Sequence, residues 1–204
     1  MKFRGIAFWL TGICIILFII QNMVSEFTEI FLLNKSALLE PWRFITAIFL
    51  HGSLPHILYN GFALILFGSI LESLLGSKRF LAVFFITGIG ANIVSLPFYD
   101  AALGASGAIF GILGALIILR PKMMVFVYGI PMPMFIAGII WVAGDVLGLF
   151  IPSNVANLAH LAGVFFGFIF GALYKKYLPK EDSRQETLKF DEKSIRSWED
   201  HYLK

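Results

Sequence analysis

The chain has 204 residues, of which 58% are hydrophobic and 14% are charged, and its mean hydropathy is +0.83. A soluble domain would carry about a quarter charged residues, so most of this chain is expected to lie in lipid. The 16 basic and 13 acidic side chains give a formal charge of +3, an excess too small to indicate a nucleic-acid partner. The single cysteine excludes an intrachain disulfide, and the four histidines lack zinc-site spacing, so neither a metal nor another cofactor is predicted.

Long, continuous apolar runs favour helices over the alternating strands of a membrane barrel, and we expect an all-α polytopic membrane protein. The first run, 5–24, starts like a signal peptide, but it has about 20 residues and lacks a small-residue cleavage site, so a retained helix is expected. The mixed segment 25–54 is predicted to be a structured loop in the membrane interface, anchored by Trp42 and Arg43. Five further spans are predicted at 55–76, 80–97, 104–119, about 132–150 and 155–174.

The predicted domain organisation is one membrane domain at 1–178 and a charged cytoplasmic tail at 179–204. The composition of the tail fits either a short amphipathic helix or a disordered segment. No internal repeat indicates a transporter built from two related halves.

Basic residues fall on one side of the predicted six-span topology. They form four pairs, which are Lys2 with Arg4, Lys78 with Arg79, Arg120 with Lys122, and Lys175 with Lys176. The opposite loops hold mostly acidic residues, with Glu26, Glu29, Glu40 and Asp100 against Lys35 and Arg43. The positive-inside rule therefore predicts that both termini are cytoplasmic.

Polar side chains inside membrane spans are costly and mark candidate functional sites. In the predicted topology, several share the outer leaflet, namely Ser106, His160, His56 and Asn60. Ser106 lies within a turn of the outer face, and His160 lies about 5 residues, or ~7.5 Å, into its span. These side chains can therefore converge near the outer surface.

Ser106 is a candidate nucleophile, because a neutral histidine can take the proton of a serine hydroxyl, and His160 is the candidate base. One helical stripe carries this histidine together with small residues that permit close packing on another helix, namely Gly163, Gly167 and Gly171. Each motif alone also fits a structural role. Glycine and serine are common packing residues in membrane helices, and a lone histidine can bond a backbone carbonyl.

His56 and Asn60 are four residues apart, so both project from one helix face. Both donate hydrogen bonds, as the oxyanion of acyl transfer requires, and the Ser106 N–H is a third candidate donor. They could equally bridge helices. Asp145, in the outer half of the fifth span, could orient His160, but the sequence favours a packing or interfacial role for this carboxylate.

Taken together, these residues resemble the rhomboid family over 41–171. The motifs that carry the resemblance occur in matching order on the predicted spans, and they are Trp42-Arg43, His51, His56-Ile57-Leu58-Tyr59-Asn60, Glu72, Gly76, Gly104-Ala105-Ser106-Gly107, Ala159-His160-Leu161-Ala162-Gly163 and Gly167. The resemblance implies a six-transmembrane-helix rhomboid-like bundle in the cell membrane. It implies a minimal, prokaryotic-type core, without the soluble N-terminal domain or seventh span of some relatives.

The same resemblance implies an intramembrane serine endopeptidase with a Ser-His dyad, in which Ser106 attacks and His160 takes the proton. It assigns the oxyanion hole to His56, Asn60 and the Ser106 amide, and the substrate pocket to Gly104, Ala105 and Phe110. Phe110 is expected to pack against the histidine. The site is expected to open outward beneath a gate near the fifth span. The implied substrates are single-pass membrane proteins cut in or near their transmembrane segment, so the implied partners are transmembrane segments and the lipid bilayer.

Two other functions fit part of the sequence. A non-catalytic rhomboid-like protein that binds membrane helices would not need both Ser106 and His160. A small transporter or channel would need polar residues through the inner leaflet, where mainly Glu72 is found. The protease is therefore the predicted function.

Overall fold

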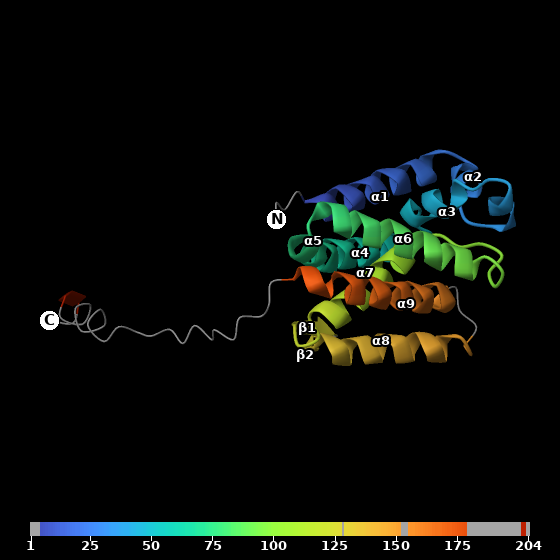
Figure 1. The fold of residues 1–204 in the computed structure, drawn as a ribbon. Coiled ribbons are helices and arrows are strands. Elements are labelled where there is room, and N and C mark those ends of the chain that lie inside the picture. The colour runs from blue at the N-terminus through green and yellow to red at the C-terminus, as the bar shows by residue number, and fades with distance from the viewer. Residues whose placement is uncertain (1–4, 128, 152–154, 179–200, 203–204) are drawn as a thin grey trace.

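The computed structural model describes residues 5–127, 129–151, 155–178 and 201–202, and the expected tail at 179–204 lies almost wholly outside the described residues. The described chain is mostly helical (Figure 1). Its longer helices are α1 (Ile6–Met23), α4 (Leu54–Ala63), α5 (Ser69–Leu75), α6 (Ser77–Ser95), α7 (Ser106–Leu119), α8 (Met134–Gly148) and α9 (Asn157–Tyr174). The short helices are α2 (Phe27–Phe31), α3 (Arg43–Thr46), η1 (Lys35–Leu38), η2 (Ala47–Phe49) and η4 (Lys175–Tyr177).

Four helical runs among the described residues are long and apolar enough to cross a membrane, and they are Ile6–Met23, Leu54–Leu75, Ser77–Ser95 and Asn157–Tyr177. The second of these joins α4 to α5 through a π-helical turn, η3 (Leu64–Gly68). The other two expected spans, α7 and α8, have 14 and 15 residues. At 1.5 Å per residue each is about 20 Å long, less than the ~30 Å of a bilayer core, so the six-span count remains a prediction.

Local sequence explains where the helices begin and end. Ser53 caps α4 by accepting a hydrogen bond from the His56 N–H, and Pro55 lies in the first turn, where its missing N–H costs nothing. Gly76 separates α5 from α6 with φ 79°, a backbone conformation that favours glycine. These two positions fix the ends of the helical run 54–75.

The centre of the bundle is α7, which packs chiefly against α9 and α6. Its glycines face those of α9 so closely that the backbones touch. A Cβ on Gly163 would lie 2.2 Å from the Gly107 carbonyl oxygen, and one on Gly167 would lie 2.1 Å from the Gly111 carbonyl oxygen. A Cβ on Gly171 would lie 2.7 Å from the Cβ of Ile118. The stripe of small residues therefore sets the distance between the two helices.

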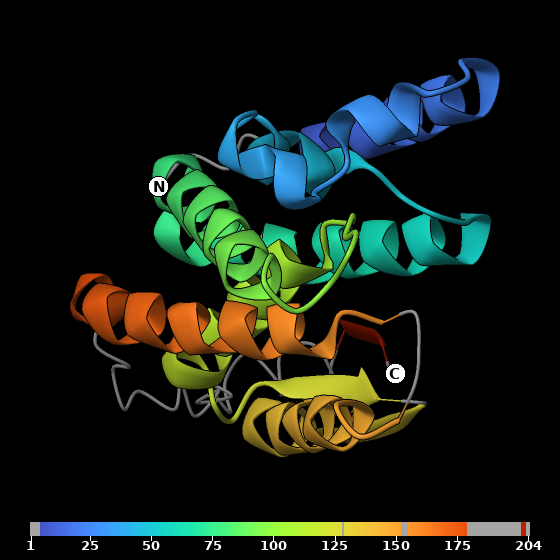
Figure 2. The same cartoon turned by 90° about the vertical axis from the view of Figure 1, so that its right-hand side faces the viewer.

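Helix α8 lies at one side of the bundle, next to α9, and α1 lies at the opposite side, as the two perpendicular views agree (Figures 1 and 2). The stretch before α8 is a β-hairpin of β1 (Met124–Val127) and β2 (Ile130–Pro133), which the all-α prediction did not include. Two prolines, Pro131 and Pro133, disfavour a helix here, because proline lacks the N–H that a helix interior needs. The fifth expected helix therefore begins only at Met134.

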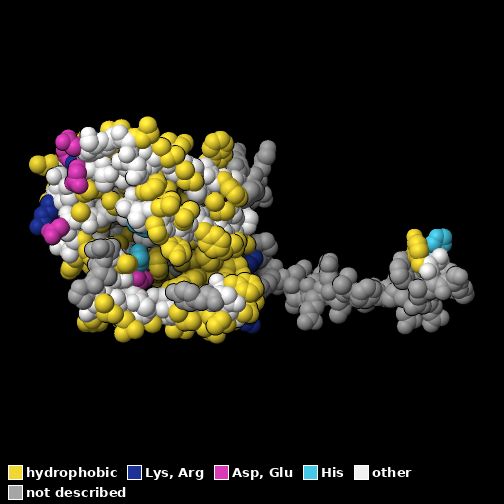
Figure 3. Space-filling model, turned by 180° about the vertical axis from the view of Figure 1, so that it is seen from behind, with side chains coloured by type: hydrophobic (Ala, Val, Ile, Leu, Met, Phe, Trp, Pro, Cys, Tyr) yellow, Lys and Arg dark blue, Asp and Glu magenta, His cyan; other side chains and the backbone are white. Residues whose placement is uncertain are grey.

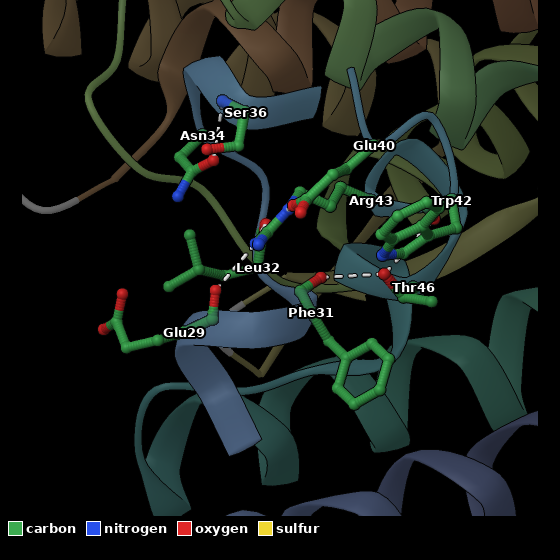
Figure 4. Close-up of polar contacts among 9 residues, drawn as sticks. All are labelled: Glu29, Phe31, Leu32, Asn34, Ser36, Glu40, Trp42, Arg43 and Thr46. Carbon is green, nitrogen blue, oxygen red and sulfur yellow. Dashed lines mark hydrogen bonds and ion pairs between the residues drawn. The ribbon is translucent and has the colours of Figure 1, made fainter. Parts of the chain in front are cut away.

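The segment between α1 and α4 folds into a compact loop around Arg43 (Figure 4). The Arg43 guanidinium donates to the Glu29 carbonyl at 2.7 Å and the Leu32 carbonyl at 2.9 Å, and it pairs with the Glu40 carboxylate. Trp42 is 47% exposed, whereas Arg43 is only 7% exposed. The prediction that Arg43 anchors this loop at the membrane interface is therefore wrong. Its side chain is needed inside the loop, where carbonyl oxygens require a buried donor.

Candidate active site

Ser106 is the first residue of α7 and is partly buried. The backbone that leads to it is held by the first loop, because the Gly104 N–H donates to the Ala47 carbonyl at 2.8 Å and Ala102 pairs with Leu33 through two 2.9 Å bonds. Gly104 has φ 127°, which turns the chain sharply just before the serine. The first loop thus positions Ser106 at the helix N-terminus.

His160 lies in the first turn of α9 and is only 9% exposed. Its ring stacks on Phe110, one turn along α7 from Ser106, with ring centroids 4.2 Å apart and an interplanar angle of 5°. The chain neighbours of the two candidate catalytic residues also approach each other, since a Cβ on Gly107 would lie 3.8 Å from the Ala159 carbonyl oxygen. The first turns of α7 and α9 therefore face each other with Ser106 on one and His160 on the other.

Asp145 of α8 also reaches His160, with 2.9 Å between its Oδ1 and the histidine Nδ1. The sequence favoured a packing or interfacial role for this carboxylate, and the structure corrects that interpretation. A signal was present, because Gly138, Trp141, Asp145 and Gly148 recur at helical spacing on one face. That face meets the bundle, since a Cβ on Gly138 would lie 2.4 Å from Ile117, and one on Gly148 would lie 2.6 Å from the Asn157 side chain.

The side chains of His56 and Asn60 approach Gly104, two residues before Ser106. A Cβ on Gly104 would lie 2.8 Å from both Cε1 and Nε2 of His56 and 3.6 Å from Nδ2 of Asn60. Asn60 is only 8% exposed, and its Nδ2 has no hydrogen-bond partner among the described residues. A buried donor without a partner is costly, so this amide is available for an acceptor that the described residues do not provide.

His51 is a buried residue of the site region that the sequence identified only through the rhomboid resemblance. The residue is 2% exposed, and its ring meets the His56 ring edge-on, with centroids 5.0 Å apart. Burial and the neighbouring His56 lower the pKa of His51 from 6.5 to about 4, so its ring is neutral at pH 7. Its Nδ1 lies 3.3 Å from the Phe49 carbonyl oxygen, and its N–H donates to Gln21. His51 thereby supports one side of the His56 ring.

The surroundings of the site are apolar. On the face seen in Figure 3, histidine and acidic side chains lie together in a hollow bordered by hydrophobic side chains. Among the described residues, no group of three or more His, Cys, Asp or Glu side chains could hold a metal ion. The arrangement offers a hydroxyl, an imidazole, a carboxylate and buried donors, which are the groups used in acyl transfer by a serine.

This fold and site define a class of protein, namely a helical membrane protein with a serine and a histidine on facing helix ends. The family model of the Rhomboid domain matches residues 38–177. This chain belongs to the rhomboid family, whose proteases are intramembrane serine proteases, and it is an enzyme of that class.

Several named relatives support this assignment. The putative rhomboid protease YdcA of Bacillus subtilis is 38% identical over 140 residues, which cover 66% of this chain and 67% of the relative. The rhomboid protease GlpG of Haemophilus influenzae is 29% identical over 175 residues, which cover 82% and 89%. The rhomboid protease GluP of Bacillus subtilis is 38% identical over 139 residues, but these cover only 26% of its length.

Proposed function

We propose that this protein is an endopeptidase that cleaves single-pass membrane proteins in or near their transmembrane segment, with Ser106 as nucleophile and His160 as base. The observation that carries the proposal is the contact between the first turns of α7 and α9. This contact sets Ser106 opposite a buried histidine whose ring is held by Phe110. Family membership alone does not assign these roles, whereas the local geometry supports them.

The proposed reaction is acyl transfer in two steps. Ser106 Oγ bonds to the scissile carbonyl carbon while His160 Nε2 takes the hydroxyl proton and the carbonyl π electrons move to oxygen. When the C–N bond breaks, the imidazolium gives its proton to the leaving amine, and an acyl-enzyme remains. Water then attacks the ester with His160 again as base, releasing a carboxylic acid and restoring Ser106.

The oxyanion formed in each step needs hydrogen-bond donors already in place. We assign this role to the side chains of His56 and Asn60 and to the Ser106 N–H. The buried Nδ2 of Asn60, which has no partner in the described part of the chain, supports this assignment, because donation to an oxyanion would satisfy it in the transition state. The Ser106 N–H lies at the start of α7, where the first N–H groups of a helix lack intrahelical partners.

The substrate pocket is assigned to Gly104, Ala105 and Phe110, beside the nucleophile. Two small residues leave room for an extended substrate backbone. The rhomboid resemblance adds a preference for small residues before the scissile bond. The substrate segment must also be extended, because a formed helix hides its carbonyl groups. We therefore propose transmembrane segments that contain small and helix-breaking residues as the preferred partners.

The proposed topology has six spans, cytoplasmic termini and an active site that opens to the outer side of the cell membrane. The basic pairs support it, although Lys2 and Arg4 lie outside the described residues. The short length of α7 is compatible with a span, because ten of its residues, Gly107 among them, are buried by other helices rather than exposed to lipid. The membrane domain is proposed to end near Leu178, where the charged tail begins.

The test is cleavage of a labelled single-pass membrane protein by the purified enzyme in detergent. Wild type should cleave, and Ser106→Ala and His160→Ala should each lose at least ~10⁴-fold in kcat, the scale seen when a serine protease loses its nucleophile or base. Ser73→Ala is a matched control, because this hydroxyl on α5 is exposed and bonds only to the Ile70 carbonyl among the described residues. Cleavage that survives in Ser106→Ala would refute the assignment.

A further inference from the structure

We infer that Asp145 is a positioning residue that orients His160, so that this enzyme works with a Ser-His-Asp arrangement rather than with a serine and histidine alone. The inference rests on the proposed function of Ser106 and His160. It adds to that function a third group, contributed by α8, which is neither the nucleophile's helix nor the base's helix.

Two contacts hold the His160 ring from different directions. Phe110 covers one face of the ring at a centroid separation of 4.2 Å, and Asp145 Oδ1 lies 2.9 Å from Nδ1 at its edge. Stacking limits the tilt of the ring, whereas the hydrogen bond limits its rotation about the ring normal. Because Asp145 and His160 are 7% and 9% exposed, solvent competes little for this bond.

The hydrogen bond also selects the tautomer of the histidine. A carboxylate accepts hydrogen bonds only, so Nδ1 must carry a proton, and this N–H donates the hydrogen bond to Asp145. Nε2 is then the unprotonated nitrogen that can accept the Ser106 proton. When it does so, the imidazolium forms beside a buried carboxylate, which stabilises the new charge. No oxidant, metal or further reactant is needed.

A purely structural tie between α8 and α9 is the alternative explanation. A buried carboxylate is an expensive way to join two helices, because its desolvation must be offset by hydrogen bonds to both oxygens. Here only Oδ1 is bonded, and Oδ2 has no partner among the described residues. A tie that leaves one charged oxygen unsatisfied fits a role in catalysis better than a role in stability.

The experiment compares Asp145→Asn and Asp145→Ala with wild type, with the exposed Asp100→Asn as a control for the loss of a carboxylate. Asparagine keeps the shape but can offer its NH₂ to Nδ1 and so favour the wrong tautomer. We expect kcat to fall ~10²-fold or more while KM changes less than about 3-fold, since soluble triads lose ~10⁴-fold in kcat on the same substitution. Asp100→Asn should match wild type.

A second readout separates positioning from stability. Formate is small enough to enter the space left in Asp145→Ala, so it should raise the kcat of that variant and leave Asp145→Asn unchanged. If Asp145→Ala does not fold, the isosteric Asp145→Asn alone decides through its kcat.

A kcat within about 3-fold of wild type in Asp145→Asn, while Ser106→Ala is inactive, would overturn the inference and leave the proposed function intact. Lost activity in Asp145→Ala would also overturn it, if that variant unfolds at a lower temperature than wild type and formate does not raise its kcat. Cleavage by Ser106→Ala would instead refute the proposed function.

Discussion

The reactivity proposed for Ser106 comes from a few neighbours on different helices rather than from its own sequence motif. The first loop fixes the backbone at Gly104, α7 supplies the ring of Phe110, and α4 brings His56 and Asn60 to the same place. Each neighbour has a distinct physical effect, so each can be tested by a single substitution.

Substitution of Gly104 tests whether the space next to the proposed oxyanion hole must stay empty. Alanine there is strained at φ 127°, and its Cβ would lie 2.8 Å from two ring atoms of His56. Gly104→Ala should therefore displace the His56 ring and lower kcat by ~10²-fold or more, the usual cost of losing an oxyanion donor. Gly52→Ala is the control, because its Cβ meets only Leu103 at an ordinary 3.7 Å. Equal activity of the two variants in the cleavage assay would contradict this explanation.

The lowered pKa of His51 predicts how the stability of the protein depends on pH. Its folded pKa of about 4 lies below its ordinary 6.5, so the unfolded chain binds a proton at a higher pH than the folded one. The stability contributed by neutral His51 is complete above pH 6.5 and is lost as pH falls from 6.5 through 4. His51→Leu should flatten the fall in unfolding temperature over this window, whereas substitution of the exposed His201 should not. An unchanged pH profile in His51→Leu would contradict the prediction.

At the scale of the elements, the contact between α7 and α9 determines the geometry of the site. Gly163→Ala would bring a Cβ to 2.2 Å from the Gly107 carbonyl oxygen, which is backbone and cannot rotate away. The helices would have to separate, at a cost of about 1–3 kcal/mol or more in stability and with a loss of cleavage. Gly12→Ala on α1 is the matched control, because nothing lies within 4 Å of its Cβ. Unfolding temperature and cleavage rate measure both effects, and a Gly163→Ala enzyme as stable and active as Gly12→Ala would count against this role.

Much of the fold could be predicted from the sequence, because apolar runs define membrane helices almost independently of their partners. The predicted span 155–174 and α9 (Asn157–Tyr174), for example, differ by two residues at one end only. The stripe of glycines after His160 also indicated a close helix contact. The hairpin at 124–133 was missed, because its strands are apolar and continue into α8 without a polar break. Asp145 was misjudged because sequence spacing shows which residues share a face, but not which helix that face meets.

At the scale of the whole molecule, the number of spans separates two topologies. If α7 and α8 cross the membrane, Asp100 and Lys122 lie on opposite sides, whereas four spans alone would leave both on one side. We expect a membrane-impermeant maleimide on intact cells to label Asp100→Cys, and to label Lys122→Cys only after permeabilisation. Both substitutions would be made in a Cys14→Ser background, since Cys14 is the only native thiol. Both positions are exposed, so equal labelling without permeabilisation would contradict six spans.

The most direct test of the central claim is covalent labelling of the purified enzyme with a fluorophosphonate, followed by mass spectrometry of the labelled peptide. The probe needs no knowledge of the substrate and reacts only with an activated serine. The proposed mechanism predicts an adduct on Ser106 in wild type and a loss of labelling in His160→Ala. Labelling of another serine, or a folded enzyme whose Ser106 stays unmodified, would contradict the assignment of Ser106 as the nucleophile.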